Sequence, residues 1–336
     1  MPRPGVTFPP IDYLANLTAS AIDGSCIVTD PRGTDRYAYV LQPISADNWE
    51  FYKFDLWSRT AQPLSNPARA ATTITARAKM VFDASGGILA TPTIWLFAPD
   101  TAGGTFFRWQ SYNIATDVWT ARSSVLAGMA AAASIDTSLC HPCNLLGAAP
   151  GPDRLIYANG DGGAWGAAGP SNLAVYDITT DTWARLVGAG PRGGAPAIGS
   201  SLDWLPQCPG YLFSFRGGGS GIIDVYGIVG NAWTAIAAAA IDPPLPFDSE
   251  GFETTTLFRY PWRILCANYG QIIAVDLTSL VVPPVAATTA LVAAIDGADG
   301  TAHQGNGLFA WQVGDKLYIG IRPHGSTAVQ RIRMIL

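Results

Sequence analysis

The sequence contains little lysine, glutamate or histidine. Its 336 residues include 3 Lys, 3 Glu and 3 His, so that nearly all charge is carried by 17 Arg and 22 Asp. The net charge is −5, and the arginines form no block or stripe. Because binding to a nucleic-acid backbone requires clustered positive charge, this distribution predicts that nucleic acid is not a partner.

Long apolar runs are absent as well, although 49% of the residues are hydrophobic and 11% are aromatic. A helix that spans a membrane needs roughly 18 or more apolar residues in succession, and the sequence offers none, so we expect no membrane span. The segment Met1 to Pro4 does not lead into the apolar region of a secretory signal. We therefore expect no signal peptide.

Cysteine is rare, with 5 residues in the chain. Cys140, His141 and Cys143 lie close together, and Cys208 falls in the equivalent connection of the next unit. These residues allow a zinc site, a disulfide between Cys143 and Cys208, or free thiols packed as small hydrophobic groups. An odd total without an export signal argues against a disulfide framework, and a single Cys-x-x-Cys pair is a weak metal signal. We therefore predict free thiols and no cofactor.

What the sequence does contain is a repeat. Three tyrosines each precede a tryptophan by seven residues, in the pairs Tyr112 and Trp119, Tyr176 and Trp183, and Tyr226 and Trp233. In each copy, strand-forming residues stand on both sides of a short turn, which predicts a β-hairpin. Weaker copies at Phe54-Asp55 and Val275-Asp276 have Ala61 and Val282 in place of the tryptophan. Such self-similarity indicates a repeat architecture.

The length of the repeat suits a unit of four strands. The residue that follows the tyrosine, or the residue in its place, has the number 55, 113, 177, 227 and 276 in the successive copies. Neighbouring copies are therefore separated by 58, 64, 50 and 49 residues. Another strand-like run precedes each hairpin, and in three copies it leads into glycines at 103–104, 162–163 and 217–219. Glycine permits the close turn that must follow such a strand.

The order of a glycine doublet, a Tyr-Asp pair and a tryptophan resembles the blades of the kelch-repeat β-propeller family. The resemblance covers most of the chain and is strong in three units. It implies an all-β fold in which four-stranded antiparallel sheets are arranged radially. Six runs align as second strands of such blades, so we predict six blades; the runs are 36–42, 94–98, 154–158, 211–215, 263–267 and 316–321.

We expect one domain over residues 1–336, with blades near 24–65, 74–125, 128–190, 196–240, 253–290 and 306–336. The last unit ends after its third strand. Because an open ring leaves unpaired N–H and C=O groups at a sheet edge, we expect residues 5–14 to complete that sheet and close the ring. The alanine-rich segment 129–135 is assigned to the inner strand of the third blade, and 235–240 to an outer strand that runs into a loop.

Candidate catalytic residues are few. Some kelch-type rings resemble galactose oxidase, whose copper site needs two His, two Tyr and a Cys. Here His141 belongs to the third unit, while His303 and His324 fall in the sixth, together with Tyr318. No phosphate loop, nucleophile elbow or dinucleotide motif is present. We predict that the protein is not an enzyme and has no catalytic, cofactor-binding or metal-binding residues; a copper oxidase or a carbohydrate-binding propeller is the alternative.

The scarcity of Lys and Glu beside many Arg, Trp and Tyr is typical of protein interfaces, although codon usage in a GC-rich genome produces a similar bias. Since a fold does not determine a function, our hypothesis is a non-enzymatic scaffold that contacts other structural proteins of an oligomeric assembly. Its specific form is a bacteriophage virion component: a decoration, neck, tail or fibre-attachment protein. A cytoplasmic adaptor of the kelch kind is a further alternative, and carbohydrate is the alternative partner.

Overall fold

The computed structural model describes the β-strands and many of the turns that join them. The described residues are 11–16, 26–30, 35–45, 48–67, 78–83, 92–99, 107–123, 138–140, 155–159, 173–186, 200–206, 208–217, 220–237, 240–242, 253–255, 263–268, 271–277, 287–294, 307–313, 316–322 and 328–334. No helix capable of crossing a membrane occurs in these segments.

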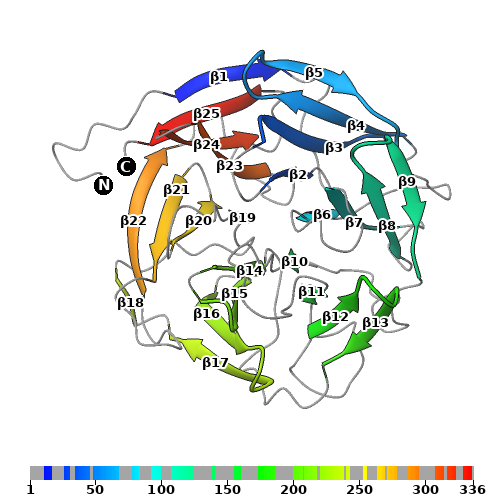
Figure 1. Ribbon diagram of the computed structural model, residues 1–336. Helices are drawn as coiled ribbons and strands as arrows, with labels where there is room; N and C mark the ends of the chain where they lie inside the picture. Colours follow the sequence, from blue (N-terminus) through cyan, green and yellow to red (C-terminus); the bar gives the residue numbers. More distant parts are fainter. Residues whose placement is uncertain are drawn as a thin grey trace.

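The described strands form six sheets arranged radially around a centre (Figure 1). The first sheet contains β2 (Cys26–Thr29), β3 (Tyr37–Ser45), β4 (Asn48–Asp55) and β5 (Thr60–Pro63), and the second contains β6 (Lys79–Asp83), β7 (Thr93–Pro99), β8 (Phe107–Asn113) and β9 (Val118–Ala121). The third contains β10 (Ser138–Cys140), β11 (Leu155–Asn159), β12 (Leu173–Asp177) and β13 (Thr182–Arg185). In each, the strands follow one another outward in chain order, as predicted for four-stranded antiparallel blades.

The fourth sheet repeats this pattern and the fifth departs from it. The fourth contains β14 (Asp203–Trp204), β15 (Tyr211–Gly217), β16 (Ser220–Gly227) and β17 (Ala232–Ile236). The fifth contains β19 (Glu253–Thr255), β20 (Arg263–Asn268), β21 (Gln271–Asp276), β22 (Ala287–Ala294) and an additional strand, β18 (Ile241–Asp242). The prediction of four strands in every blade is therefore wrong for the fifth sheet. The reason is that the chain leaving β17 pairs in parallel with β22, Ile241 opposite Ala287, before it enters β19.

The first and last strands of the chain share the sixth sheet. It contains β23 (Gly307–Val313), β24 (Lys316–Arg322), β25 (Ala328–Met334) and β1 (Ile11–Asn16). β1 is antiparallel to β25, with Ile11 opposite Ile332 and Asn16 opposite Ala328. The predicted closure by an N-terminal strand is thus observed, although the strand spans 11–16 and not 5–14. It begins after Pro9 and Pro10, which lack the N–H that a ladder requires; residues 5–10 lie outside the described residues.

Strands were predicted for two alanine-rich segments, and the structure describes part of the second one only. The inner strand of the third sheet is β10, which begins three residues beyond the predicted segment 129–135. That segment lies outside the described residues. The second stretch behaves as predicted at its start, since β17 ends at Ile236. A single turn follows, in which the Ala240 N–H donates to the Ala237 carbonyl at 2.8 Å.

Aromatic and aliphatic side chains fill the spaces between neighbouring sheets. The same contact is made at the three interfaces that join the first four blades. The Tyr and Trp of a hairpin pack on a residue of the previous blade that lies three positions before the tyrosine of that blade, or before Phe54 in the first blade. Phe51 lies 4.9 Å from Tyr112 and 5.1 Å from Trp119, between ring centroids. Trp109 lies 5.1 Å from both Tyr176 and Trp183. Leu173 joins the buried cluster that contains Tyr226 and Trp233. The repeated aromatic residues therefore hold adjacent blades together.

Candidate functional site

The hairpin between the third and fourth strands of a blade is the most regularly repeated element of the chain. Tyr112 is the cross-strand partner of Trp119, as Tyr176 is of Trp183 and Tyr226 of Trp233. The seven-residue spacing in the sequence therefore reflects a β-hairpin, whose turn places the tyrosine opposite the tryptophan on the next strand. Ring centroids in these pairs are 5.0, 5.2 and 5.0 Å apart.

The turn contains a residue that the sequence analysis missed. Five positions after the tyrosine stand Asp117, Asp181 and Asn231, with φ of 56°, 52° and 46° in the left-handed region that Asp and Asn tolerate best among non-glycine residues. The tyrosine hydroxyl donates to this side chain, at 2.8 Å from Tyr112 to Asp117 and 2.7 Å from Tyr226 to Asn231. The signal was available in the sequence as Tyr-x4-Asp/Asn-x-Trp.

The same carboxylates bind the preceding blade. Asp117 accepts a hydrogen bond from the Ser65 N–H at 2.9 Å, and Asp181 accepts one from the Ser123 N–H at 3.1 Å. Burial acts to raise the pKa of Asp117, but the hydrogen bonds from Ser65 and Tyr112 outweigh it, so the pKa lies below its ordinary value of 3.8. The pKa of Asp181 is lowered in the same way. These groups stabilise the contacts between neighbouring blades.

The first blade carries a modified copy of this turn. Phe54 has no hydroxyl, and Arg59 occupies the left-handed position with φ 61°. With Ala61 opposite Phe54, no tryptophan closes the hairpin. A different tryptophan, Trp57, stands in the turn and is 60% exposed. A large aromatic side chain in such a position is unusual because its burial would be favourable by about 2 kcal/mol or more.

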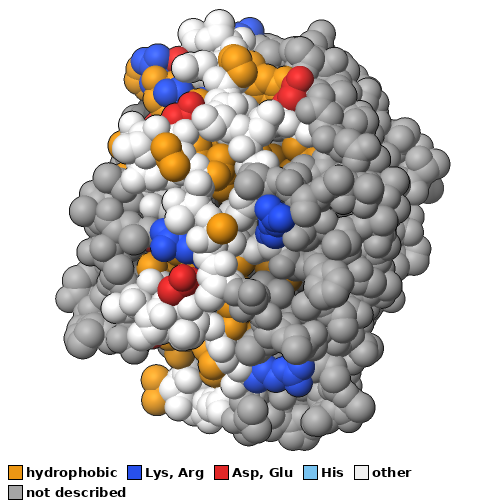
Figure 2. Space-filling view, turned by 90° about the vertical axis from the view of Figure 1, so that its right-hand side faces the viewer, with side chains coloured by type: hydrophobic (Ala, Val, Ile, Leu, Met, Phe, Trp, Pro, Cys, Tyr) orange, Lys and Arg blue, Asp and Glu red, His pale blue; other side chains and the backbone are white. Residues whose placement is uncertain are grey.

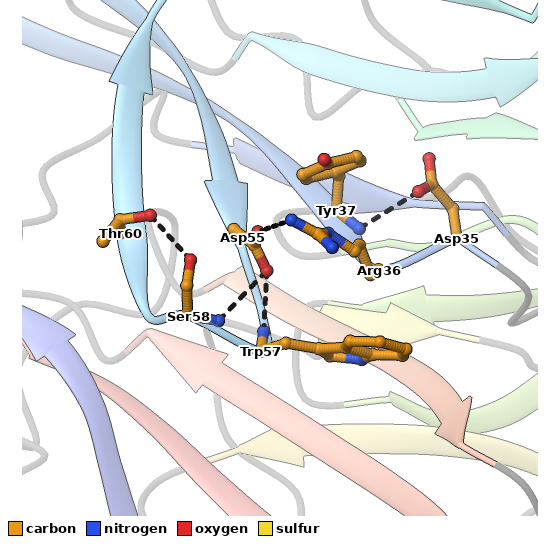
Figure 3. Close-up of polar contacts among 7 residues, drawn as sticks. All are labelled: Asp35, Arg36, Tyr37, Asp55, Trp57, Ser58 and Thr60. Atoms are coloured by element: carbon orange, nitrogen blue, oxygen red, sulfur yellow. Dashed lines mark hydrogen bonds and ion pairs between the residues drawn. The ribbon is translucent and has the colours of Figure 1, made fainter.

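Trp57 belongs to a stack of three side chains, Tyr37, Arg36 and Trp57, here called the Arg36 stack. Figure 3 shows the Arg36 side chain between the two rings. Its guanidinium carbon lies 5.1 Å from the Tyr37 centroid and 5.6 Å from the Trp57 centroid, within cation–π range. Strand register produces the arrangement, because Tyr37 pairs with Asp55 and the Leu56 N–H donates to the Arg36 carbonyl at 2.9 Å.

Asp55 lies beside the Arg36 guanidinium and holds the stack through hydrogen bonds (Figure 3). It is 7% exposed. Its Oδ1 accepts from the N–H groups of Trp57 and Ser58 at 2.9 and 3.2 Å, and its other oxygen pairs with Arg36 (Figure 3). Burial acts to raise the pKa of Asp55, but these hydrogen bonds outweigh it and lower the pKa. Asp55 is therefore a carboxylate that orients both the turn backbone and the guanidinium.

Two further charged residues flank the stack. The Lys53 ammonium lies 4.3 Å from the Tyr37 centroid. Asp35 accepts from the Tyr37 N–H at 3.3 Å (Figure 3). Burial raises the pKa of Asp35, with its neighbour Asp30 acting in the same direction. Asp55 is buried and Asp35 is half-buried, whereas Arg36 and Trp57 are exposed.

The outer strands form a second surface of interest, here called the rim. Their exposed positions on β5, β9, β13 and β17 carry Thr, Ala, Gln, Pro and Val, and Arg185 is the one charged residue among them. Val118 on β9 is 50% exposed and Val229, in the turn before β17, is 94% exposed. Figure 2 shows the side of the ring on which β9 lies, where the described charged side chains are scattered among other groups.

The predicted cysteine residues divide between described and undescribed parts of the chain. Cys208 is a free thiol, buried in the core cluster between the fourth and fifth sheets. Burial raises its pKa to about 11. The prediction of a small hydrophobic thiol is confirmed for this residue, and the disulfide to Cys143 is not formed. His141 and Cys143 lie outside the described residues, as does the side chain of Cys140. Within the described part of the chain, no group of three or more metal-ligating residues occurs.

The histidines of the copper alternative are not placed. His141, His303 and His324 all lie outside the described residues, so the oxidase alternative stays a prediction. Tyr318, the tyrosine considered with them, packs on Trp311 at 5.3 Å, and the Arg331 guanidinium lies 5.2 Å from its ring.

Comparison with known proteins identifies the fold and nothing narrower. No family model and no curated protein matches the sequence. Among solved structures, a protein of unknown function from Bacteroides thetaiotaomicron aligns with a TM-score of 0.56 and 7% identity over 96% of this chain and 76% of that one. A protein from Thermus thermophilus, named as an oxidoreductase (glucose dehydrogenase), aligns with a TM-score of 0.51 and 14% identity, over 97% and 100% of the two chains.

TolB from Acinetobacter baumannii is also similar, with a TM-score of 0.46 and 12% identity over 90% of this chain. The chain spans 64% of the length of TolB. At identities this low, the likeness concerns the fold alone. Together with the six radial sheets, the likeness to the Thermus protein shows that the chain is a β-propeller.

Proposed function

We propose that the protein is a non-enzymatic interaction propeller, built into a larger assembly such as a phage virion as a decoration, neck, tail or fibre-attachment protein. The observation that carries the proposal is the scarcity of charge on the rim strands β5, β9, β13 and β17. Natural edge strands are usually protected by lysine or other charges against pairing with further chains. On β5, β9, β13 and β17 the exposed positions carry one charge, on Arg185.

The chemistry of the described residues agrees with this proposal. The acids with lowered pKa values are used to hold turns and neighbouring blades: Asp55, Asp117 and Asp181. The ion pair of half-buried Arg216 and buried Asp224, with a 2.6 Å contact, joins two strands of the fourth sheet. Exposed Val118 on β9 adds apolar area to the rim. A surface of this composition is suited to contact with neighbouring proteins.

The test is the size of the protein in its native assembly and the effect of charges on the rim. We expect the protein to be recovered from its native source in a particle much larger than one chain. Thr120→Lys and Ala184→Lys, on β9 and β13, should prevent incorporation because each places an unpaired charge in the contact, while leaving the circular dichroism spectrum unchanged. Thr116→Lys, in the turn before β9, is the matched control and should incorporate normally.

Two results would contradict the proposal. One is a protein that is monomeric both in dilute solution and in its native source. The other is stoichiometric copper in the purified protein, which would favour the oxidase alternative.

A further inference from the structure

We infer that the Arg36 stack is a binding site for an acidic saccharide, with Trp57 as the stacking platform and Arg36 as the group that binds the carboxylate or sulfate. The inference is independent of the proposed assembly function, which rests on the rim. It begins from an aromatic residue that the fold does not use. Trp57 is 60% exposed, whereas the tryptophans of the other three hairpins pack between blades.

The platform is rigid before any ligand arrives. The Asp55 carboxylate holds the backbone of Trp57 and Ser58 through two hydrogen bonds, and the Arg36 guanidinium lies over one face of the Trp57 ring. Figure 3 shows Arg36 between the rings of Tyr37 and Trp57, with Asp55 beside it. Preorganisation of this kind lowers the entropy lost on binding.

The neighbours of Trp57 favour an amphipathic ligand over a protein side chain. Ser58 in the turn and Thr60 at the start of β5 are exposed and polar, and their hydroxyls are 2.8 Å apart. A hot spot for protein binding sits in a packed, desolvated surround. A single exposed ring among hydroxyl and guanidinium groups instead suits a sugar, which has an apolar C–H face and hydrogen-bonding edges.

The charge near the ring favours an acidic sugar. The side chain of Arg36 is 44% exposed and the side chain of its partner Asp55 is 10% exposed, so the cation of this pair faces solvent more than the anion. A guanidinium has five N–H donors, and its pairing with Asp55 leaves several for a ligand carboxylate or sulfate. Exposed Arg59 and half-buried Lys53 add positive charge close by. One or two cations match an acidic sugar, but they do not form the continuous basic track that nucleic acid needs.

The test measures binding of the full chain to immobilised polygalacturonate and heparin, with neutral dextran as the control polysaccharide and oligo-dT as the nucleic-acid probe. We expect binding to one or both acidic polysaccharides, weakened by salt, and little binding to dextran or oligo-dT. Comparison of the two acidic probes distinguishes a preference for carboxylate from one for sulfate.

The variants assign binding to the stack. Trp57→Ala and Arg36→Gln should each weaken binding by about tenfold or more, the effect of losing one good contact. Trp57→Phe keeps a ring and should retain most of the binding, which distinguishes stacking from a change in fold. Arg185→Gln removes an exposed arginine from the rim and should bind as wild type does. Trp57→Ala, Trp57→Phe and Arg36→Gln leave the exposed residues of the rim strands unchanged and should assemble normally, so failure here and failure of the assembly proposal are distinguishable.

Several outcomes would overturn the inference. They are the absence of binding to either acidic polysaccharide, equal binding to dextran, stronger binding to oligo-dT, and unchanged binding by a correctly folded Trp57→Ala variant.

Discussion

The aspartate with positive φ in a hairpin turn has three structural roles. Asp117 allows the positive φ, accepts the Tyr112 hydroxyl and accepts the N–H of Ser65 from the preceding blade. Asn231 performs the first two duties without a charge. Blade contacts in this propeller are therefore made by short polar side chains as well as by the aromatic residues beside them.

At this scale we predict that Asp117→Asn loses about 0.5–1 kcal/mol of unfolding free energy at neutral pH, because a charged acceptor becomes a neutral one. The folded-state pKa of Asp117 lies below 3.8. The carboxylate therefore contributes stability above 3.8, and this contribution disappears as the pH falls through the lowered folded-state value. Denaturant titrations at several pH values should show the variant and the wild type converging in acid.

Thr116→Ala, at the preceding exposed position of the same turn, is the control and should follow the wild-type pH profile. A constant difference between Asp117→Asn and wild type at all pH values would show that the charge of Asp117 does not stabilise the fold.

At the scale of a single strand, Gly320 is a position that has no space for a side chain. Gly320 on β24 lies opposite Phe309 on β23. A Cβ atom at Gly320 would stand 2.0 Å from the Phe309 ring. Phe309 is 1% exposed and stacks on Trp311 at a centroid distance of 5.4 Å, so it has little room to move. Glycine here gives an aromatic ring space to lie across the neighbouring strand.

We predict that Gly320→Ala destabilises the protein by about 1–3 kcal/mol, the usual cost of overpacking a core. Gly227→Ala is the matched control, since a Cβ there meets its nearest atom at 3.6 Å, an ordinary contact. It should change the unfolding free energy by less than about 0.5 kcal/mol. Equal effects of the two substitutions in denaturant titrations would contradict the packing argument.

The elements that could be predicted from the sequence are those whose chemistry is local. The hairpins of Tyr112, Tyr176 and Tyr226 were identified because both partners lie within one turn. β18 was not, because its parallel pairing with β22 joins segments about 45 residues apart and leaves no local pattern. The Arg36 stack was missed for the same reason: it depends on the register that sets Tyr37 opposite Asp55 in a copy without the expected tryptophan.

For the molecule as a whole, the sequence allowed prediction of a closed ring from an unfinished last unit. The structure supplies the missing strand as β1, beside β25. Figure 1 shows the two labelled strands side by side at the outside of the ring. What the sequence does not contain is a local signal for the exact residues of β1, since pairing over more than three hundred residues is set by the geometry of the completed ring.

We predict that removal of residues 1–16 lowers the unfolding free energy by about 3–5 kcal/mol, because several ladder hydrogen bonds to β25 are lost. The exposed edge of β25 should also cause concentration-dependent aggregation, measured by light scattering. A circular permutant that carries residues 1–16 after Leu336 should restore stability, because β1 can then follow β25 as an ordinary antiparallel neighbour. A truncated chain as stable as the full one would contradict a closing role for β1.

The direction of β1 sets how the ring resists mechanical load. Ile11 and Ile332 face each other, so the chain enters β1 and leaves β25 at the same end of the pair. Tension applied through the flanking segments would peel the two strands apart one hydrogen bond at a time instead of shearing all of them together. The pairing of β1 with β25 should therefore separate under a small force, before any blade unfolds.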